Sequence, residues 1–202
     1  MQLYYAPGAC SLASHIALQE LGLPYEAVRV SLRDKKTRSG EDYNAINPKG
    51  YVPALRLDNG ELLTEGPALL AYIGELRPQS NLIPAPSTLA NYRVREWLVF
   101  IGTELHKTAS PLFRPTTPEP TRQVQLEALK RQLGFVEAAM AGRPFLTGEH
   151  FTVADAYLFT VLNWFPRLQL DLAEWPNLQA LHARVHARAA VQIVMRDEGL
   201  LT

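Results

Sequence analysis

Patterns typical of β-strands occur only in the first third of this 202-residue chain, and that asymmetry constrains the fold most. Two apolar runs, Leu3–Tyr5 and Tyr25–Val30, flank a helical pattern at 11–21, so these strands should be parallel. Two further runs, Ala54–Leu57 and Glu61–Leu63, meet at the turn Asp58-Asn59-Gly60, which predicts an antiparallel hairpin. The segment therefore mixes parallel and antiparallel pairing.

Helical patterns complete this first part of the chain. The polar stretch 33–45 predicts a surface loop with a short helix, and Gly66-Pro67 is typical of the start of a helix that runs to about Leu76. The order is β-α-β-α-β-β-α. We interpret residues 1–77 as a thioredoxin-like α/β domain.

After a Pro-rich break at 78–87 the strand patterns disappear. Long helices are predicted at 88–109 and at 121–141, and a Pro cluster lies between them. Thr152 and Asp155 form a capping-box pattern ahead of the apolar helix Ala156–Phe165, which should be the buried centre. Shorter helices are predicted at Leu178–Ala187 and Ala190–Arg196. We therefore expect a linker at 78–87 and an all-α domain at 88–202.

Composition excludes several classes of function. The chain has 20 basic and 20 acidic side chains and a formal net charge of zero, which gives no electrostatic case for nucleic acid. No apolar stretch is long enough to span a membrane, and the first residues show no signal-peptide pattern. The single cysteine excludes an internal disulfide, and we expect a reducing compartment, the cytoplasm.

That cysteine, Cys10, lies between the first predicted strand and the first predicted helix. Unpaired N–H groups and the positive end of the helix dipole favour a thiolate at such a position. A small, buried and inert cysteine is the alternative interpretation. The segment alone leaves both open.

Two further motifs precede secondary-structure elements. Tyr51-Val52-Pro53 comes directly before a strand, where a cis proline would leave the Val52 N–H and C=O groups facing outward to pair with an extended peptide. Composition alone favours a trans proline that merely ends a loop. At the start of the next helix, the Gly66 N–H group suits a carboxylate and Glu65 suits an ammonium group, although simple helix capping is the alternative. Together with Cys10, these motifs describe a site for a small thiol peptide.

Six segments carry a resemblance to a known family: MQLYYAPGACSLASHIAL, NPKGYVPAL, LLTEGPAL, TELHK, PLFRP and FTVADAYLF. They resemble the bacterial beta-class glutathione transferases over essentially the whole chain. The resemblance implies a homodimer that binds glutathione in the thioredoxin-like domain, with the second substrate between the two domains. It also implies that Cys10 can form a mixed disulfide with glutathione.

The resemblance implies further site residues. Lys35 would lie at the glycine end of glutathione, and Val52, Glu65 and Gly66 would act as described above. From the helical domain it brings Thr103, Glu104, Leu105 and His106, of which His106 is the best candidate to tune the thiol. Ser11, beside Cys10, is a weaker catalytic candidate, because its hydroxyl could reach the sulfur. Tyr5 is expected to be a structural core aromatic.

Two positions depart from the family pattern. Tyr51 stands where many members carry Gln, and a phenol offers one hydroxyl where an amide offers an acceptor and two donors. Val99 stands where some relatives carry Asn, so no polar contact is expected from it.

The resulting function hypothesis is a glutathione transferase that joins the glutathione thiolate to small apolar electrophiles held near His106, Phe113 and Trp164. It needs no cofactor beyond glutathione as co-substrate, and no metal-ligand spacing is visible. One alternative is a glutathione-dependent thiol-disulfide reductase or reductive dehalogenase that uses Cys10 as nucleophile. Another is a non-enzymatic protein that binds apolar compounds.

Overall fold

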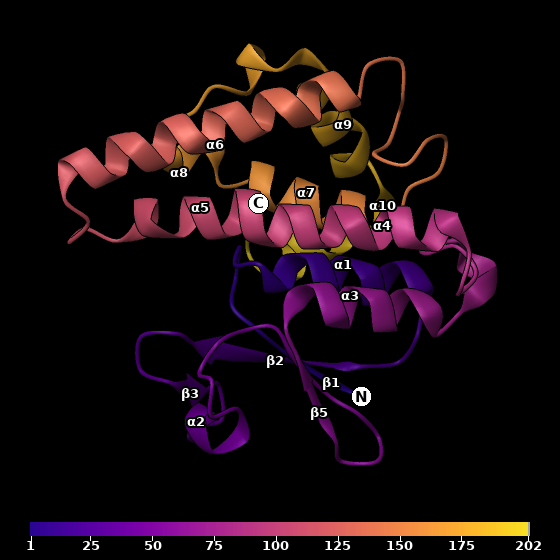
Figure 1. Ribbon diagram of the computed structural model, residues 1–202. Helices are drawn as coiled ribbons and strands as arrows, with labels where there is room; N and C mark the ends of the chain where they lie inside the picture. Colours follow the sequence, from indigo (N-terminus) through magenta and orange to yellow (C-terminus); the bar gives the residue numbers. More distant parts are fainter. Residues whose placement is uncertain (202) are drawn as a thin grey trace.

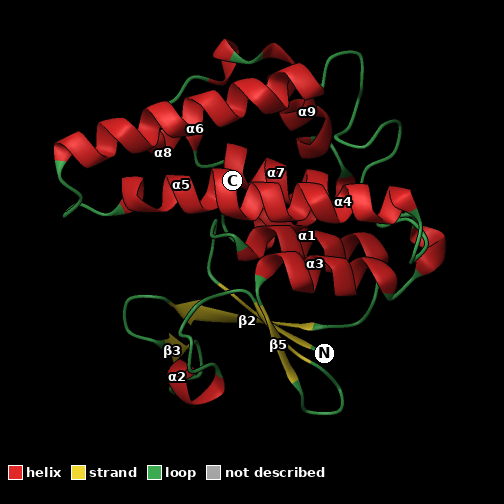
Figure 2. Ribbon diagram, in the orientation of Figure 1, coloured by secondary structure: helices red, strands yellow, loops and turns green. Residues whose placement is uncertain are grey.

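The computed structural model describes residues 1–201, and every strand in this range lies before Gly66. The strands form one five-stranded sheet in the order β3-β2-β1-β4-β5 (Figures 1 and 2). Their bounds are β1 Gln2–Tyr5, β2 Glu26–Ser31, β3 Lys36–Thr37, β4 Ala54–Arg56 and β5 Leu62–Thr64. As predicted, β1 and β2 are parallel, and β5 pairs with β4 as an antiparallel hairpin. The two-residue β3 was missed because so short a strand shows no alternation.

Helices cover both faces of the sheet. The helices of this half are α1 Ser11–Leu21, α2 Tyr43–Ile46 and α3 Gly66–Glu75. Figure 1 shows α1 and α3 between the sheet and the remaining helices, and the short α2 beyond the opposite face near β3. Gly22 ends α1 in the left-handed conformation that glycine tolerates best, as its sequence position predicted.

The rest of the described chain is helical. After the short 3-10 helix η1 Pro78–Ser80, the elements are α4 Leu89–Phe100, η2 Ile101–His106, α5 Lys107–Ala109, η3 Ser110–Phe113, α6 Glu119–Ala139, α7 Val153–Leu162, α8 Phe165–Leu168, η4 Leu172–Glu174, α9 Pro176–His186 and α10 Ala189–Asp197. No helix within residues 1–201 is long and apolar enough to cross a membrane.

One predicted helix is interrupted. The segment 88–109 was expected to be one long helix, but η2, between α4 and α5, is a π-helix. A π-turn is wider than an α-turn, and such turns are common at functional sites. Here the π-turn brings Gly102, Thr103 and His106 to the wall of a cleft between the two halves of the molecule.

The predicted capping box opens α7, and its carboxylate is a buried structural centre. Asp155 accepts hydrogen bonds from the Thr152 N–H (2.8 Å), from the Thr152 hydroxyl (2.8 Å) and from the Leu146 N–H (2.8 Å). Burial raises the pKa of Asp155 to about 6, although these donors act in the opposite direction. Every residue of α7 is buried, which confirms it as the centre of the helical half.

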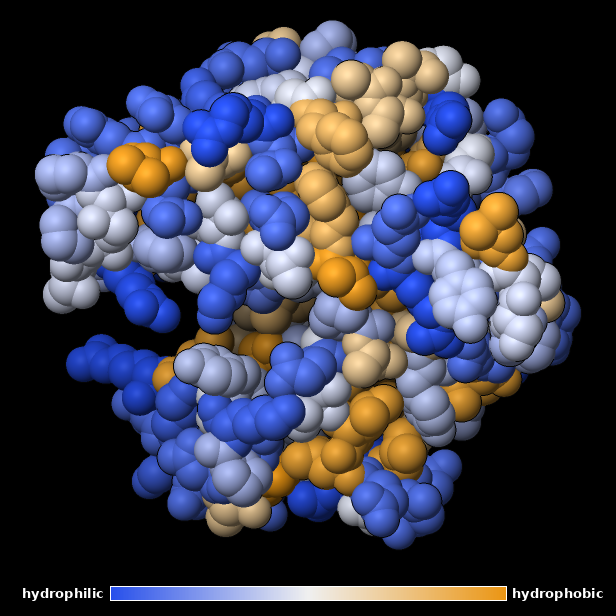
Figure 3. Space-filling model, in the orientation of Figure 1, coloured by the Kyte–Doolittle hydropathy of each residue, from blue (hydrophilic) through white to orange (hydrophobic). Residues whose placement is uncertain are grey.

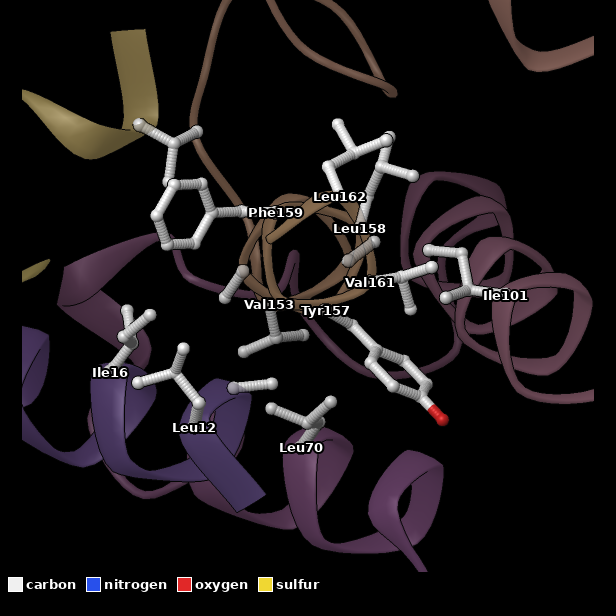
Figure 4. Packing of buried hydrophobic residues seen from close by; sticks show 14 of the residues in the cluster. Leu12, Ile16, Leu70, Ile101, Val153, Tyr157, Leu158, Phe159, Val161 and Leu162 are labelled. Atoms are coloured by element: carbon white, nitrogen blue, oxygen red, sulfur yellow. The ribbon is translucent and has the colours of Figure 1, made fainter. Parts of the chain in front are cut away.

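A continuous core joins the two halves. Figure 4 shows Leu12 and Ile16 of α1 and Leu70 of α3 facing Val153 of α7. A second, smaller cluster that includes Tyr43 lies on the other face of the sheet. The change from strands to helices agrees with the predicted fold class, while the limits 1–77, 78–87 and 88–202 remain predictions.

Candidate functional site

A cleft of about 730 Å³ lies between the thioredoxin-like half and the helical half. Figure 3 shows the molecule hollowed on its left side, between the ends of the two halves, with strongly hydrophilic side chains on either side of the opening. The residues that line the cleft are Cys10, Asn47, Lys49, Tyr51, Val52, Pro53, Thr64, Glu65, Gly66, Pro67, Val99, Gly102, Thr103, His106, Lys107, Ser110, Arg114 and Tyr157.

Cys10 lines this cleft, immediately before α1. Its thiol donates a hydrogen bond to the Val52 carbonyl, with 3.1 Å between sulfur and oxygen. The residue is partly exposed, but its sulfur is enclosed, and this burial raises the pKa of Cys10 to about 12. The backbone N–H groups of Cys10 and Ser11 act in the opposite direction without outweighing burial. The helix start therefore does not produce a free thiolate at neutral pH, contrary to one interpretation of the sequence.

Two side chains hold the corner before β4, one from α2 and one from the residue that follows α2. The Tyr51 carbonyl accepts hydrogen bonds from the Tyr43 hydroxyl (2.8 Å) and from the Asn47 amide (2.8 Å). The Val52–Pro53 bond is cis, so the trans bond that composition favoured is wrong. Within residues 1–201 the Val52 N–H group donates to no acceptor, which leaves it available to a ligand.

The start of α3 forms the next part of the same wall. Glu65 has a φ of 72°, an uncommon conformation for a residue with a side chain, and Gly66 and Pro67 follow as the first helical residues. Lys49 donates to the Glu65 carboxylate (2.8 Å) and to the Thr64 hydroxyl (2.9 Å). Both charged side chains of this ion pair are largely exposed, so water and a ligand can compete for them.

The opposite wall consists of side chains from the helical half. His106 Nδ1 lies 2.7 Å from the Tyr157 hydroxyl oxygen, and the two rings meet edge to face. Burial, and then the charge of Lys107, lower the pKa of His106 to about 4. Burial chiefly, with the nearby Cys10 and Glu65, raises the pKa of Tyr157. Both side chains are therefore neutral at physiological pH.

Aromatic packing connects this wall to the loop before Cys10. The ring centroids of His106 and Trp164 are 4.9 Å apart, and those of Trp164 and Phe113 are 5.5 Å apart. The Trp164 indole N–H donates to the Gly8 carbonyl at 2.9 Å. The helical wall and the Cys10 loop are thus fixed relative to each other.

Comparisons with known proteins decide the family. The family model "Glutathione S-transferase, N-terminal domain" matches residues 8–76, and "Glutathione S-transferase, C-terminal domain" matches residues 100–189. The chain belongs to the glutathione S-transferase family. It is 44% identical to Glutathione S-transferase GstA of Escherichia coli O157:H7 over 99% of this chain and 100% of that protein.

Solved structures place the chain close to the bacterial beta class. A ternary complex of BphK, a bacterial glutathione S-transferase, has a TM-score of 0.97 and 48% identity and covers 98% of this chain and 100% of its own. The beta-class glutathione S-transferase of Sphingomonas chungbukensis has a TM-score of 0.96 and 41% identity over the full length of both chains. A sphingomonad glutathione S-transferase complexed with glutathione has a TM-score of 0.96 and 44% identity, also over both full lengths.

The cleft of this glutathione S-transferase family member brings together most of the predicted site residues. Cys10, Val52, Glu65, Gly66, Thr103 and His106 all line it. Tyr51 and Val99, the two departures from the family pattern, line it as well, and both are largely exposed. Tyr5 is buried against the His15 ring, in keeping with a structural role.

Four predicted residues lie elsewhere. Ser11 is fully buried, and its hydroxyl donates to the Ala6 carbonyl (3.3 Å) and accepts from the Ala6 N–H (3.1 Å), so it faces the preceding loop and not the cleft. Leu105 is a core residue with no exposed surface. Glu104 is half-buried outside the lining. Lys35 donates to the Gly50 carbonyl at 2.8 Å and lies over the Tyr51 ring, beside the cleft.

Several cleft residues were missed by the sequence analysis. Asn47, Lys49 and Arg114 come from polar loops in which no pattern distinguishes them from ordinary surface residues. Tyr157 lies in the apolar run of α7, and its hydroxyl was the available signal, because a buried tyrosine hydroxyl usually has a hydrogen-bond partner. Its partner His106 is 51 residues away, beyond the reach of local patterns.

Proposed function

We propose that this chain conjugates the thiol of glutathione to small apolar electrophiles. The observation that carries the proposal is one wall on which a thiol peptide finds a complementary group for each of its parts. An unpaired N–H group at Val52 suits its backbone, a helix start at Gly66 suits its head-group carboxylate, and Glu65 suits its ammonium group. Its sulfur would lie beside Cys10.

In this arrangement the glutathione ammonium group displaces Lys49 from Glu65, because both are cations that compete for one exposed carboxylate. Lys35, next to Tyr51, would meet the glycine carboxylate. Thr103 and His106 would border the sulfur from the opposite wall, with Glu104 and Leu105 supporting them from behind. Ser11 would act only by holding the Ala6–Cys10 loop.

The reacting sulfur is that of glutathione. Its thiol proton leaves to solvent, the thiolate attacks the electrophilic carbon, a carbon–sulfur bond forms and the leaving group departs with its bonding pair. A protonated Cys10 would donate its S–H to that thiolate by turning it away from the Val52 carbonyl, its acceptor in this structure. The raised pKa of Cys10 supports this donor role over an attack by Cys10 itself, since the thiolate and not the thiol is the nucleophile.

The proposal includes a homodimer. Outside the cleft, helices α4 and α6 carry large apolar side chains that are more than half exposed, namely Leu89, Tyr92, Val124 and Phe135. An apolar surface of this kind suits a self-complementary interface. Light scattering after size exclusion should give the mass of a dimer, and a monomer at working concentration would contradict it. The single free thiol suits a reducing compartment, and we place the protein in the cytoplasm.

Calorimetric titration with glutathione tests the binding part directly. Glu65→Gln should weaken binding about tenfold or more, because a charge-assisted hydrogen bond is lost. N-acetylglutathione, which lacks the ammonium group, should bind wild type and Glu65→Gln equally weakly. Glu61→Gln, an exposed acid in the β4–β5 turn, is the matched control and should bind like wild type. Equal affinity of Glu65→Gln and wild type for glutathione would sink the assignment.

A further inference from the structure

The contact between Tyr157 and His106 defines where the imidazole proton lies. A phenol is a stronger hydrogen-bond donor and a weaker acceptor than a neutral imidazole, so across 2.7 Å the hydroxyl donates and Nδ1 accepts. Within residues 1–201 the Tyr157 hydroxyl has no other hydrogen-bond partner. A neutral imidazole that accepts at Nδ1 must carry its proton on Nε2.

The Nε2–H group is accessible from the cleft. It makes no hydrogen bond within residues 1–201. If Nε2 were fully enclosed, it would be a buried polar atom without a partner, but the Ser14 hydroxyl oxygen is the only such side-chain atom in that range. His106 Nε2 therefore keeps contact with solvent, and the ring lines the cleft. Figure 4 shows Tyr157 leaving the apolar helix α7 with its hydroxyl in the space between α3 and the helical segment that carries Ile101.

We propose that Tyr157 is a positioning residue that holds His106 as an Nε2–H donor toward the second substrate. The proposal rests on the conjugation proposed above and narrows its substrate class. The site favours electrophiles in which the attacked carbon passes its electron pair to a hydrogen-bond acceptor, such as a nitro or carbonyl oxygen. Electrophiles whose charge goes only to a departing halide gain nothing from this donor.

The electron balance shows where the donor acts. When glutathione thiolate attacks a nitroaryl halide, the new carbon–sulfur bond pushes a ring electron pair onto the nitro oxygens. His106 donates a hydrogen bond to one of these oxygens without giving up its proton, and the pair returns when the halide leaves. A fixed donor aimed at developing charge lowers the barrier to that intermediate. In benzyl chloride the displaced pair goes to chloride, and no acceptor oxygen develops charge.

Imidazole ¹H–¹⁵N correlation spectra test the placement of the proton without any turnover. The chain has five histidines, and His106→Asn assigns the His106 signals by their loss. Wild type should show Nε2 protonated and Nδ1 unprotonated, and Tyr157→Phe should show a mixture of tautomers. A wild-type spectrum with the proton on Nδ1 would overturn the inference.

Kinetics test the substrate class. The measured quantity is the ratio of kcat/KM for 1-chloro-2,4-dinitrobenzene to that for benzyl chloride. Tyr157→Phe should lower this ratio about threefold to tenfold, the usual worth of one neutral hydrogen bond. Tyr72→Phe is the matched control, because Tyr72 of α3 lies outside the cleft and its hydroxyl makes no hydrogen bond within residues 1–201. It should leave the ratio unchanged.

A double-mutant cycle separates positioning from general damage. Asn at position 106 keeps an N–H donor but has no tautomer to select, so Tyr157→Phe should have no further effect on the ratio in a His106→Asn background. A purely structural role would lower kcat/KM for both electrophiles in equal proportion, which would overturn the inference. If wild type conjugates neither electrophile, the proposed function and the substrate class both fail, while the spectra still decide where the proton lies.

Discussion

The two walls of the cleft present polar groups in different ways. On the thioredoxin-like wall, the Val52 and Gly66 groups belong to the backbone and are set by a proline corner and a helix start. On the helical wall, the polar groups include the side chains of His106 and Tyr157, which are in contact although they lie 51 residues apart in the sequence. The first wall suits the peptide, whose backbone is the same in every reaction. The polar groups of the second wall can be changed by single substitutions, which suits an electrophile that varies.

The walls share one electrostatic property. Burial raises the pKa of Cys10 to about 12 and lowers that of His106 to about 4, so both are uncharged at neutral pH. The Lys49–Glu65 ion pair of this region is largely exposed, and two further charged side chains, Lys107 and Arg114, line the cleft. In the function proposed above, Glu65 would bind the ammonium group of the peptide, and the neutral Cys10 and His106 would face the reacting atoms.

Removing a side chain that supports the thioredoxin-like wall should have the largest effect on glutathione binding and on stability. Asn47→Ala deletes the amide that bonds the Tyr51 carbonyl. We expect the KM for glutathione to rise about tenfold, with a loss of about 1–3 kcal/mol in the free energy of unfolding, because the Tyr51 carbonyl loses one of its two donors and the Lys49 N–H group loses its acceptor. Steady-state kinetics and urea unfolding measure the two. Asn44→Ala, an exposed neighbour in α2 whose side chain makes no hydrogen bond within residues 1–201, is the control.

A pair of glycines tests the contact between the halves. A methyl group on Gly74 of α3 would lie 2.9 Å from Ile83 and 3.4 Å from Val153, so Gly74→Ala should destabilise by about 1–3 kcal/mol through overpacking. Gly134 of α6 has no atom within 4 Å of such a methyl, so Gly134→Ala should stabilise by up to about 1 kcal/mol. Thermal unfolding compares them. Equal shifts would mean that the halves are not closely packed at Gly74.

The smallest expected effect concerns pH. Burial first, and His186 second, lower the pKa of His182 in α9 to about 4. The unfolded chain binds that proton near pH 6.5, so it binds more protons than the folded chain between about pH 6.5 and 4. Stability is therefore lost as pH falls through this window. His182→Gln should make the free energy of unfolding fall less steeply between pH 7 and pH 5, measured by urea unfolding, than in wild type. An unchanged slope would count against burial as the cause.

The contrast between the walls also explains which site residues could be predicted from the sequence and which could not. Cys10, Val52, Glu65 and Gly66 sit in short motifs whose turn and helix-start chemistry is local, so they could be found without a structure. The capping box of Thr152 and Asp155 belongs to the same class. The thiol's raised pKa could not be predicted, because it depends on groups packed around the sulfur from both halves. Tyr157 was missed for the same reason. Ser11 was proposed because it is adjacent to Cys10 and Leu105 because the family resemblance implied it, and neither argument says which way a side chain points.

The central claim is that the reacting sulfur belongs to glutathione, with Cys10 as a protonated neighbour. The most direct test is the kcat/KM of Cys10→Ala for conjugation of 1-chloro-2,4-dinitrobenzene with glutathione. We predict that conjugation persists, reduced by about tenfold at most, the worth of one hydrogen bond. Loss of conjugation in a folded Cys10→Ala protein that still binds glutathione would show that the essential sulfur is that of Cys10.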